Sequence, residues 1–389
     1  MRRAVVVGAL GTTQTMAWGS SYYLPAILAE PIAEGLGLSR AMVFGVFSGS
    51  LLLSALLGPA VGRAIDNRGG RGVLVLPNLV LAAGLILLSL AQGVIGLAAA
   101  WAVLGVGMAL GLYDAAFATL AGLYGRAARG PITGITLIAG FASTIGWPLS
   151  AFLDASLGWR GACLAWAALN LLVCLPLNRL LIPRAPPPER AAEPEGSATV
   201  APRGAMPILA FVFAATWFVT GAMAAHLPRL LEIAGASSTA AIAAAALVGP
   251  GQVAARLVEF GALRWIHPLV SARIAASLHP VGAGILAAFG APAIMAFALF
   301  HGAGNGLLTI AKGTLPLAIF GPVGYGLRNG ILAAPARAAQ AASPLIFGLL
   351  IDWLGVGALA ISAAMSIAAL LALIGLRART AAAAVPSRA

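Results

Sequence analysis

The chain has 389 residues, of which 61% are hydrophobic (about 237 side chains) and only 9% are charged. A soluble domain carries about 25% charged residues, so this composition excludes a soluble enzyme, a secreted disulfide scaffold and a nucleic-acid-binding domain. At ~20 residues per membrane-spanning helix, the apolar side chains suffice for roughly 12 spans. The two cysteines, Cys163 and Cys174, form no metal-binding motif.

Apolar runs between charged or Pro/Gly-rich breaks predict twelve transmembrane helices. Open β-structure cannot cross a bilayer, and these runs are much longer than the alternating strands of a barrel. The first run follows Met1-Arg2-Arg3 and is too long for the ~7–15-residue apolar core of a signal peptide. The predicted spans are 4–30, 39–63, 72–92, 95–124, 132–153, 160–182, 206–228, 237–262, 269–289, 291–312, 329–351 and 355–376.

The basic residues predict the orientation in the membrane. With a cytoplasmic N-terminus, seventeen arginines fall on the cytoplasmic side, and only Arg40, Arg160 and Arg229 fall on the opposite side. This bias follows the positive-inside rule and places both termini in the cytoplasm, for a multi-pass protein of a bacterial-type cytoplasmic (inner) membrane. The net charge of +12 is therefore a topology signal, and nucleic-acid binding is not needed to explain it.

One long polar stretch interrupts the spans. It reads PRAPPPERAAEPEGSATVAPRG from residue 183 to 204 and predicts a flexible cytoplasmic linker. We expect an N-terminal six-helix half at 1–182, the linker at 183–205, a C-terminal six-helix half at 206–376 and a cytoplasmic tail at 377–389.

The two halves show weak similarity at an offset of about 197. At this offset Gly105 and Gly107 fall on Gly302 and Gly304, although glycine is abundant enough for chance matches. Agreement with the linker position favours a duplication. The predicted fold is an all-α membrane protein with twelve helices in two pseudo-symmetric halves, an architecture in which transporters hold their substrate near the midplane.

The loop between the second and third predicted spans carries a motif. It reads GPAVGRAIDNRGGR over 58–71 and resembles the G-x-x-x-D-x-x-G-x-R motif of the major facilitator superfamily; an ordinary basic loop is the alternative. Gly62 permits close helix packing, Asp66 can bind the N-terminal end of a neighbouring helix, and Arg68 and Arg71 can pair with acids. The resemblance implies a monomeric secondary active transporter that works by alternating access on a small molecule.

A narrower resemblance involves the stretch from Tyr22 to Leu74, which is similar to the monocarboxylate and oxalate–formate branch of that superfamily. In this branch an arginine of the eighth span holds the substrate carboxylate, and an acid four residues earlier takes a proton. The matching residues are Arg256 and Gln252, so the arginine is present and glutamine replaces the acid. The resemblance thus implies that Arg256 anchors an anion beside Gln252.

Four of the ionisable residues within predicted spans stand out, since a charge there costs ~2.5–3.5 kcal/mol and is a candidate for function or pairing. They are Asp114, Arg256, Lys312 and Arg337. The repeat offset places Asp114 next to Lys312, and the resemblance places all four at a central cavity. We expect Lys312 and Arg337 to support anion binding and Asp114 to carry a proton.

Structural roles are the alternatives for these charges. Asp114 could form a permanent salt bridge, and Arg337 could bind helix carbonyl groups. Arg256 could pair with Glu259 three residues later. Lys312 could extend to the cytoplasmic boundary.

Other polar residues in the spans are weaker candidates. Gln14, Trp18 and Tyr22 share one helix face by their i, i+4 spacing, which could line the cavity or serve helix packing. His226, His279 and His301 could relay protons, but lone histidines in apolar helices are more often structural.

The sequence thus predicts a secondary active transporter of a small solute, preferably an organic anion, with proton coupling. The alternative is a proton-antiport exporter of drugs or toxic compounds, including metalloids. A membrane receptor would need a larger soluble domain, and an enzyme would need a nucleophile–base or metal-binding arrangement. No nucleotide-binding glycine-rich loop is present, and no cofactor is expected.

Overall fold

The computed structural model describes residues 2–184, 202 and 204–376, and within them it contains helices and turns but no strand. Most of the predicted linker and the whole predicted tail lie outside the described residues. Helix formation pairs the backbone N–H and C=O groups within the segment, except those of the end turns, as a lipid environment requires. Two helices begin with a serine N-cap: Ser39 accepts from the N–H of Met42, and Ser237 accepts from that of Ala240.

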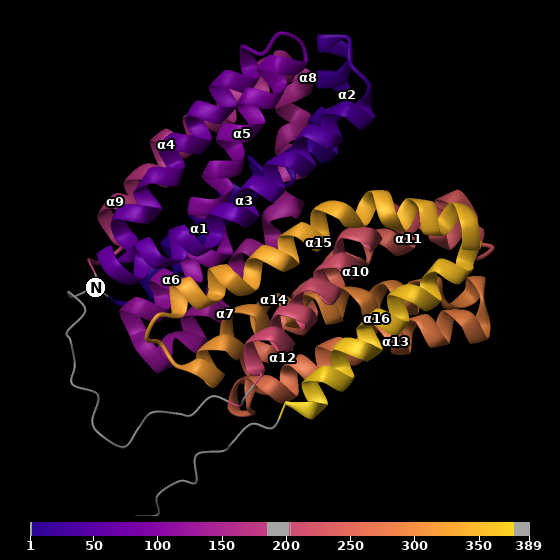
Figure 1. Cartoon of the computed structure of the whole chain (residues 1–389). Helices are drawn as coiled ribbons and strands as arrows, with labels where there is room; N and C mark the ends of the chain where they lie inside the picture. Colours follow the sequence, from indigo (N-terminus) through magenta and orange to yellow (C-terminus); the bar gives the residue numbers. More distant parts are fainter. Residues whose placement is uncertain (1, 185–201, 203, 377–389) are drawn as a thin grey trace, which may run out of the picture.

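The described helices form two bundles (Figure 1). The N-terminal bundle consists of α1 (Arg3–Gly19), α2 (Leu24–Leu36), α3 (Arg40–Arg68), α4 (Gly70–Ser89), α5 (Gly93–Gly111), α6 (Tyr113–Tyr124), η1 (Gly125–Ala128), α7 (Arg129–Ile138), η2 (Ala139–Phe141), α8 (Ala142–Leu169), the π-helical η3 (Asn170–Cys174) and α9 (Leu175–Leu181). The C-terminal bundle consists of α10 (Ala205–Ile233), α11 (Ser238–Ala246), α12 (Val248–Gly261), η4 (Leu263–Trp265), α13 (Pro268–Phe289), η5 (Ala291–Ala293), α14 (Ile294–Phe320), α15 (Tyr325–Leu354), η6 (Gly355–Gly357) and α16 (Ala358–Gly375).

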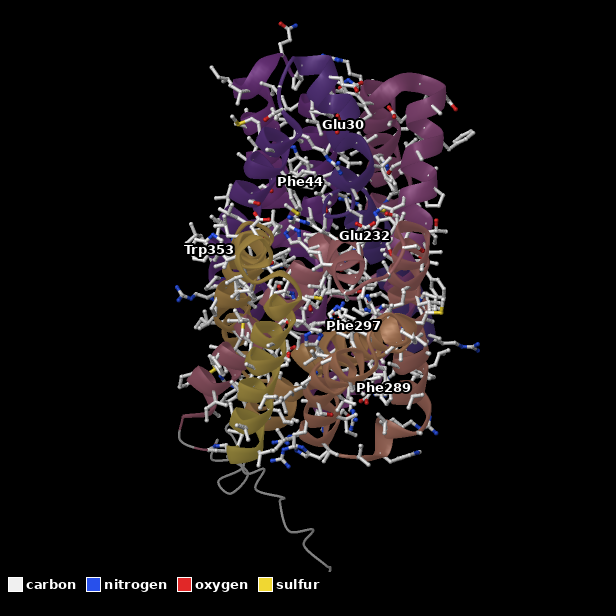
Figure 2. All side chains as sticks on the ribbon, turned by 90° about the vertical axis from the view of Figure 1, so that its right-hand side faces the viewer. Glu30, Phe44, Glu232, Phe289, Phe297 and Trp353 are labelled. Atoms are coloured by element: carbon white, nitrogen blue, oxygen red, sulfur yellow. The ribbon has the colours of Figure 1, made fainter. Side chains whose placement is uncertain are left out.

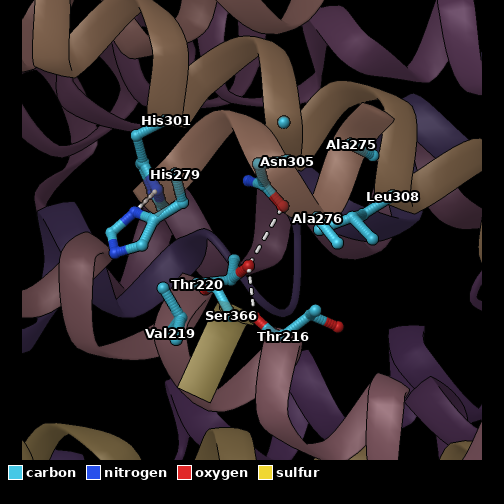
Figure 3. A pocket seen from close by; sticks show the side chains of 11 residues that line it. Thr216, Val219, Thr220, Ala275, Ala276, His279, His301, Asn305, Leu308 and Ser366 are labelled. Atoms are coloured by element: carbon cyan, nitrogen blue, oxygen red, sulfur yellow. Dashed lines mark hydrogen bonds between the residues drawn. The ribbon is translucent and has the colours of Figure 1, made fainter. Parts of the chain in front are cut away.

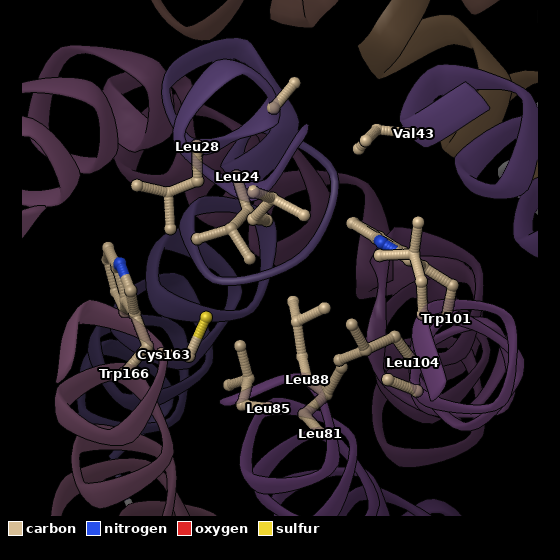
Figure 4. Close-up of a cluster of buried hydrophobic side chains, with 14 of the residues drawn as sticks. Leu24, Leu28, Val43, Leu81, Leu85, Leu88, Trp101, Leu104, Cys163 and Trp166 are labelled. Carbon is tan, nitrogen blue, oxygen red and sulfur yellow. The ribbon is translucent and has the colours of Figure 1, made fainter. Parts of the chain in front are cut away.

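Each bundle has its own apolar core. In the N-terminal bundle, Leu24 and Leu28 of α2 pack with Leu85 of α4, Trp101 of α5 and Trp166 of α8 (Figure 4). The clusters of the C-terminal bundle are built from α10 to α16 alone. Ala341 of α15 joins the N-terminal cluster, and Leu317 and Tyr325 join a further cluster with α3, α6 and α7, so apolar contacts also connect the two bundles.

Hydropathy supports a membrane location. Eight stretches of described helix are long and apolar enough to cross a membrane. Two of them, Gly93–Leu181 and Tyr325–Gly375, join several successive helices into one stretch. The all-helical, membrane-embedded fold predicted from composition is therefore confirmed.

Several predicted spans have different boundaries in the structure. The predicted span 4–30 is divided into α1 and α2 by a turn, and the predicted span 95–124 is divided into α5 and α6 at Leu112, whose ψ of −175° is extended. The predicted span 291–312 ends too early, because α14 continues to Phe320 through Gly313 and Pro316. Pro316 lies inside the helix without ending it, and the missing Cβ of Gly313 leaves room for the ring of Phe117.

The two bundles meet at one end of the molecule and diverge toward the other (Figure 1). The end where they meet carries Arg63, Arg68, Arg71, Arg126 and Arg129, and we refer to it as the basic end. Figure 2 views the molecule from the diverging side, with Glu30 on the N-terminal bundle and Glu232 and Trp353 on the C-terminal one.

Glycines bring α3 and α15 together near the basic end. Gly58 of α3 faces Gly330 of α15, and Gly62 faces Gly326. A Cβ atom on Gly62 would overlap the carbonyl group of Gly326, so only glycine allows the two backbones to approach this closely. The close helix packing predicted for Gly62 is thus observed.

Opposite charges are paired at the far end. Arg40 lies 3.7 Å from Glu30, and Arg229 lies 2.7 Å from Asp352. The guanidinium of Arg160 lies 4.0 Å from the ring centroid of Trp159. Two of the three arginines predicted for this side therefore have acidic partners, which strengthens the contrast with the basic end.

Candidate functional site

A cavity lies between the two bundles. The cavity is lined from α1 and the turn after it, from α3, α6, α10, α14 and α15, by Trp18, Tyr22, Leu51, Ser54, Leu112, Tyr113, Asp114, Phe117, Trp217, Thr309, Lys312, Arg337 and Gln340. We refer to it as the central cavity.

A buried cluster of one anion and two cations lies in its wall. Oδ1 of Asp114 is 2.9 Å from Nζ of Lys312, and Oδ2 is 2.6 Å from Nη2 of Arg337. Nδ2 of Asn329 donates a further bond of 3.2 Å to Oδ1. Since one carboxylate faces two cations, the cluster carries a net charge of +1 with all three groups ionised.

The position of Asp114 follows from the break between α5 and α6. The extended backbone at Leu112 starts a new helix at Tyr113, which places Asp114 in the first turn of α6. Backbone N–H groups at a helix N-terminus favour a nearby negative charge. The carboxylate is thus stabilised both by the helix and by its two cationic partners.

Each cation has a second contact. Arg337 donates through Nη1 to the hydroxyl of Ser54, and the ammonium of Lys312 lies 5.0 Å from the ring centroid of Trp217. The expected juxtaposition of Asp114 and Lys312 is confirmed by their 2.9 Å contact. The alternative, extension of Lys312 to the membrane boundary, is wrong because its side chain is only 6% exposed.

Aromatic side chains form the wall beside the charges. The Trp18 ring lies 5.1 Å from that of Tyr22 and 5.0 Å from that of Tyr113, and Tyr113 stacks on Phe117 at 5.3 Å. The hydroxyl of Tyr22 accepts a 2.8 Å hydrogen bond from Nε2 of Gln340. The cavity therefore combines a charged wall with an apolar one.

Gln14 lies outside the central cavity, although it shares a helix face with Trp18 and Tyr22 in the sequence. Its Nε2 donates a 2.5 Å hydrogen bond to the carbonyl of Gly111, at the end of α5. This bond joins α1 to the helix break before Asp114. Of the three residues predicted to line the cavity, Trp18 and Tyr22 do so.

Arg256 and Gln252 also lie outside the central cavity. Arg256 donates from Nη1 to the carbonyl of Thr136 in α7 and from Nη2 to Oε1 of Gln252, both at 3.2 Å. The predicted pairing of Arg256 with Glu259 is wrong, because Oε1 of Glu259 is 2.9 Å from Nη2 of Arg129 on α7. A long-range partner thus takes the place of the local one, and Arg256 bridges the bundles.

Arg129 is the centre of a second bridge at the basic end. Besides Glu259, it donates to the carbonyl of Ile266 at 2.6 Å and to that of Leu263 at 3.0 Å. These two carbonyl groups lie in η4 and directly after it, in the segment between α12 and α13. A single side chain of the N-terminal bundle therefore binds both Glu259 of α12 and this segment.

The loop motif forms a third bridge. Oδ1 and Oδ2 of Asp66 accept 2.8 Å hydrogen bonds from the backbone N–H groups of Gly326 and Leu327, at the N-terminus of α15. The predicted role of Asp66 is thus observed. Arg71 donates to the carbonyl of Arg179 at the end of α9, and the described residues contain no ion pair of Arg68 or Arg71, so their pairing with acids stays a prediction.

Sequence reasoning missed several residues of the site. Asn329 and Gln340 lie on α15 eight residues before and three residues after Arg337, and both contribute to the central cavity or its ion cluster. This spacing places all three on one helical face, so a search for polar positions in register with Arg337 would have found them. Ser54 and Trp217 carry no comparable signal.

Many secondary transporters hold buried polar groups in a cavity between two helical bundles. The family model of the Major Facilitator Superfamily matches residues 10–289, well over half of the chain. The chain belongs to the Major Facilitator Superfamily and is therefore a membrane transporter of small molecules and not an enzyme.

One relative is similar in sequence over part of the chain. This relative is a protein of Mycolicibacterium smegmatis (strain ATCC 700084 / mc(2)155) described as an MFS-type efflux pump, and the two chains are 32% identical over 188 residues. The match spans 46% of this chain and 42% of that protein, so less than half of the relative's length is matched.

Solved structures share the fold over nearly the whole chain. The human organic anion transporter MFSD10 has a TM-score of 0.70 at 18% identity, covering 96% of this chain and 99% of that one. The proton:xylose symporter XylE has a TM-score of 0.77 at 15% identity, covering 96% of each chain. The transporter FucP in an outward conformation has a TM-score of 0.74 at 14% identity, covering 97% and 100%.

Proposed function

We propose that this protein moves a small organic anion across the membrane by alternating access, coupled to protons. The observation that carries the proposal is the Asp114–Lys312–Arg337 cluster in the central cavity, where one carboxylate is shared by two buried cations. A buried excess of positive charge favours an anionic ligand, because burial makes the uncompensated charge expensive.

Proton coupling follows from exchange of partners within the cluster. A proton on Asp114 removes its negative charge, so Arg337 and Lys312 lose their partner and can bind the carboxylate of the solute. Arg337 presents a planar fork suited to two parallel hydrogen bonds, and Lys312 supplies a point charge. Proton and anion therefore bind together, which makes symport the preferred mode.

The aromatic wall accounts for the apolar part of the solute. Trp18, Tyr113 and Phe117 present ring surface beside the ion cluster, and Tyr22 with Gln340 adds hydrogen-bonding groups. Arg337 takes the role of main anion anchor that the sequence resemblance gave to Arg256. We assign Arg256 and Gln252 to the bridge between α12 and α7, so membership of the monocarboxylate and oxalate–formate branch stays a prediction.

We further propose that the two bundles are the rigid halves of a monomeric transporter. The halves comprise residues 1–182 and 206–376, with six spans each, joined by a linker at 183–205. We propose that the basic end, with both termini, faces the cytoplasm of a bacterial-type inner membrane. The bridges of Asp66 and Arg129 close this end, so the structure corresponds to an outward-facing state.

A second candidate function is a proton-antiport exporter of drugs or toxic compounds, including metalloids. The similarity to a protein described as an efflux pump favours it. In an antiporter the solute and the proton compete for the cluster, whereas in the symporter they bind together. The sign of the pH effect on solute binding separates the two functions.

The test starts with a thermal-shift screen of the purified protein against carboxylates, metalloid oxyanions and common drugs. A hit is then followed in proteoliposomes under an imposed pH gradient. We expect Arg337→Gln to abolish flux and Asp114→Asn to leave exchange without proton-driven accumulation. Asp352→Asn, which removes an exposed ion pair at the far end, is the control. Flux of Arg337→Gln at the level of the unmodified protein would refute the proposed site.

A further inference from the structure

A second polar cavity lies inside the C-terminal bundle, apart from the central cavity (Figure 3). Its polar lining comes from α10, α13, α14 and α16, and it contains two histidines, His279 and His301. No Asp, Glu, Lys or Arg is among the described residues that line it. The lining residues are Thr216, Val219, Thr220, Ala275, Ala276, His279, His301, Gly304, Asn305, Leu308 and Ser366.

The hydrogen bonds around the two histidines fix which nitrogen carries the proton. The hydroxyl of Ser362 donates its only hydrogen to the carbonyl of Leu359 at 2.9 Å, so towards His279 it accepts, from Nε2–H at 3.0 Å. The neutral ring of His279 then has a free lone pair on Nδ1. That lone pair accepts from Nδ1–H of His301 at 3.0 Å, which leaves Nε2 of His301 without a proton.

This arrangement can take up one proton without breaking any of its bonds. A proton added to Nε2 of His301 gives an imidazolium, whose Nδ1–H donates a stronger, charge-assisted bond to Nδ1 of His279. A second proton would place two N–H donors face to face across 3.0 Å. We propose that the His279–His301 pair is a proton-binding site separate from Asp114, and that it holds a single proton.

His279 supplies the acceptor for the charged N–H of His301, since no carboxylate is among the described residues that line the cavity. Facing the pair are hydroxyl groups of α10 and α16 and the ring of Phe297, whose centroid is 5.5 Å from that of His279. None of the described residues of α16 is ionisable. The ionisable groups along these packed elements are Arg273 of α13, Lys312 of α14, His226, Arg229 and Glu232 of α10, and Arg256 and Glu259 of α12.

The pair is connected to the central cavity through one face of α14. His301, Asn305, Thr309 and Lys312 follow one another at helical spacing over about 16 Å. Thr220 donates to Oδ1 of Asn305 at 3.1 Å, and Thr309 donates to the carbonyl of Asn305 at 2.9 Å. Thr309 and Lys312 line the central cavity, so the proton site and the ion cluster share one polar helix face.

Nuclear magnetic resonance of labelled histidines tests the proposal without a transported solute. The chain has only four histidines, so His226→Gln with His267→Asn leaves the pair as the only imidazoles. His226 is half-buried and binds the Pro344 carbonyl, and asparagine at 267 keeps an acceptor for the N–H of Leu269. The protein, in lipid nanodiscs and without a histidine tag, is titrated between about pH 8 and pH 5, where imidazole changes charge.

We expect one Nδ1–H and one Nε2–H tautomer at the alkaline end, and uptake of one proton by His301 alone on acidification. His301→Gln should abolish this uptake, whereas His279→Gln, which retains an acceptor oxygen, should preserve it. Two rings that stay neutral throughout, or two that titrate together, would overturn the proposal. If the double background unfolds, the unmodified protein is titrated, with the four signals assigned by single replacements. Because no solute is needed, failure here is distinguishable from failure of anion transport.

Discussion

The docking of Asp66 on the N-terminus of α15 gives a prediction whose size can be derived from the structure. The carboxylate accepts two backbone N–H bonds of 2.8 Å from Gly326 and Leu327, across the boundary between the bundles. Hydrogen bonds to charged groups contribute ~1.5–3 kcal/mol each. Asp66→Asn keeps one neutral acceptor, and Asp66 is only half-buried, so we expect a net loss of about 2 kcal/mol.

A loss of about 2 kcal/mol corresponds to a roughly 30-fold shift in the equilibrium between closed and open basic ends. Spin labels at Gly72→Cys on α4 and Trp265→Cys in η4 would report it, because both positions are exposed and one lies on each bundle. The native cysteines are buried and do not compete for the label. Electron–electron distance measurements should show a longer distance gaining population in Asp66→Asn.

The matched control is Asp352→Asn, which also neutralises a hydrogen-bonded carboxylate but breaks a contact within the C-terminal bundle. It should leave the distance distribution unchanged. An unchanged distribution in Asp66→Asn would mean that this docking does not hold the basic end closed, and the reasoning above would be refuted.

Three further predictions concern stability, measured as thermal unfolding of the purified protein. Arg129→Gln leaves Glu259 buried without its cation and should lower the free energy of unfolding by ~3–5 kcal/mol. Adding Glu259→Gln should recover part of this loss. If Arg129→Gln unfolded at the same temperature as the unmodified protein, the result would contradict the bridge. Asp114→Asn leaves two cations together and should lower the unfolding temperature, while adding Lys312→Met should raise it again; no recovery would argue against the cluster. Burial, and then two nearby arginines, lower the pKa of His267. The unfolded chain therefore binds a proton at this residue more readily, and stability should fall as the pH drops below about 6.5. His267→Asn should show a smaller fall in stability, and a fall as large as that of the unmodified protein would exclude His267 as the cause.

Much of the fold could be predicted from the sequence because a bilayer leaves few alternatives. Hydropathy alone identifies the helical class, and the arginine distribution separates the basic end from the far end. The breaks within the helices could not be predicted in this way. Leu112 is apolar and its neighbours are apolar, so hydropathy is unchanged where the backbone becomes extended and starts α6.

The candidate site was predictable only where a repeat or a motif carried the information. The offset between the halves brought Asp114 to Lys312, and the loop motif indicated the role of Asp66. The partners of Arg256 and Glu259 were not predictable, because local spacing favours their pairing with each other whereas the folded chain brings Arg129 from another helix. The Arg337 contact with Asp114 joins residues 223 positions apart and has no local signature.

The glycine contacts between α3 and α15 have a mechanical consequence. Side chains that interlock resist sliding, because each must change rotamer before its neighbour can pass. At Gly58, Gly62, Gly326 and Gly330 the two helices touch through smooth backbone surfaces. One helix can rotate against the other there without any change of side-chain rotamers, so this crossing can serve as the pivot between the two bundles. A bulky residue at any of the four positions would block this rotation sterically.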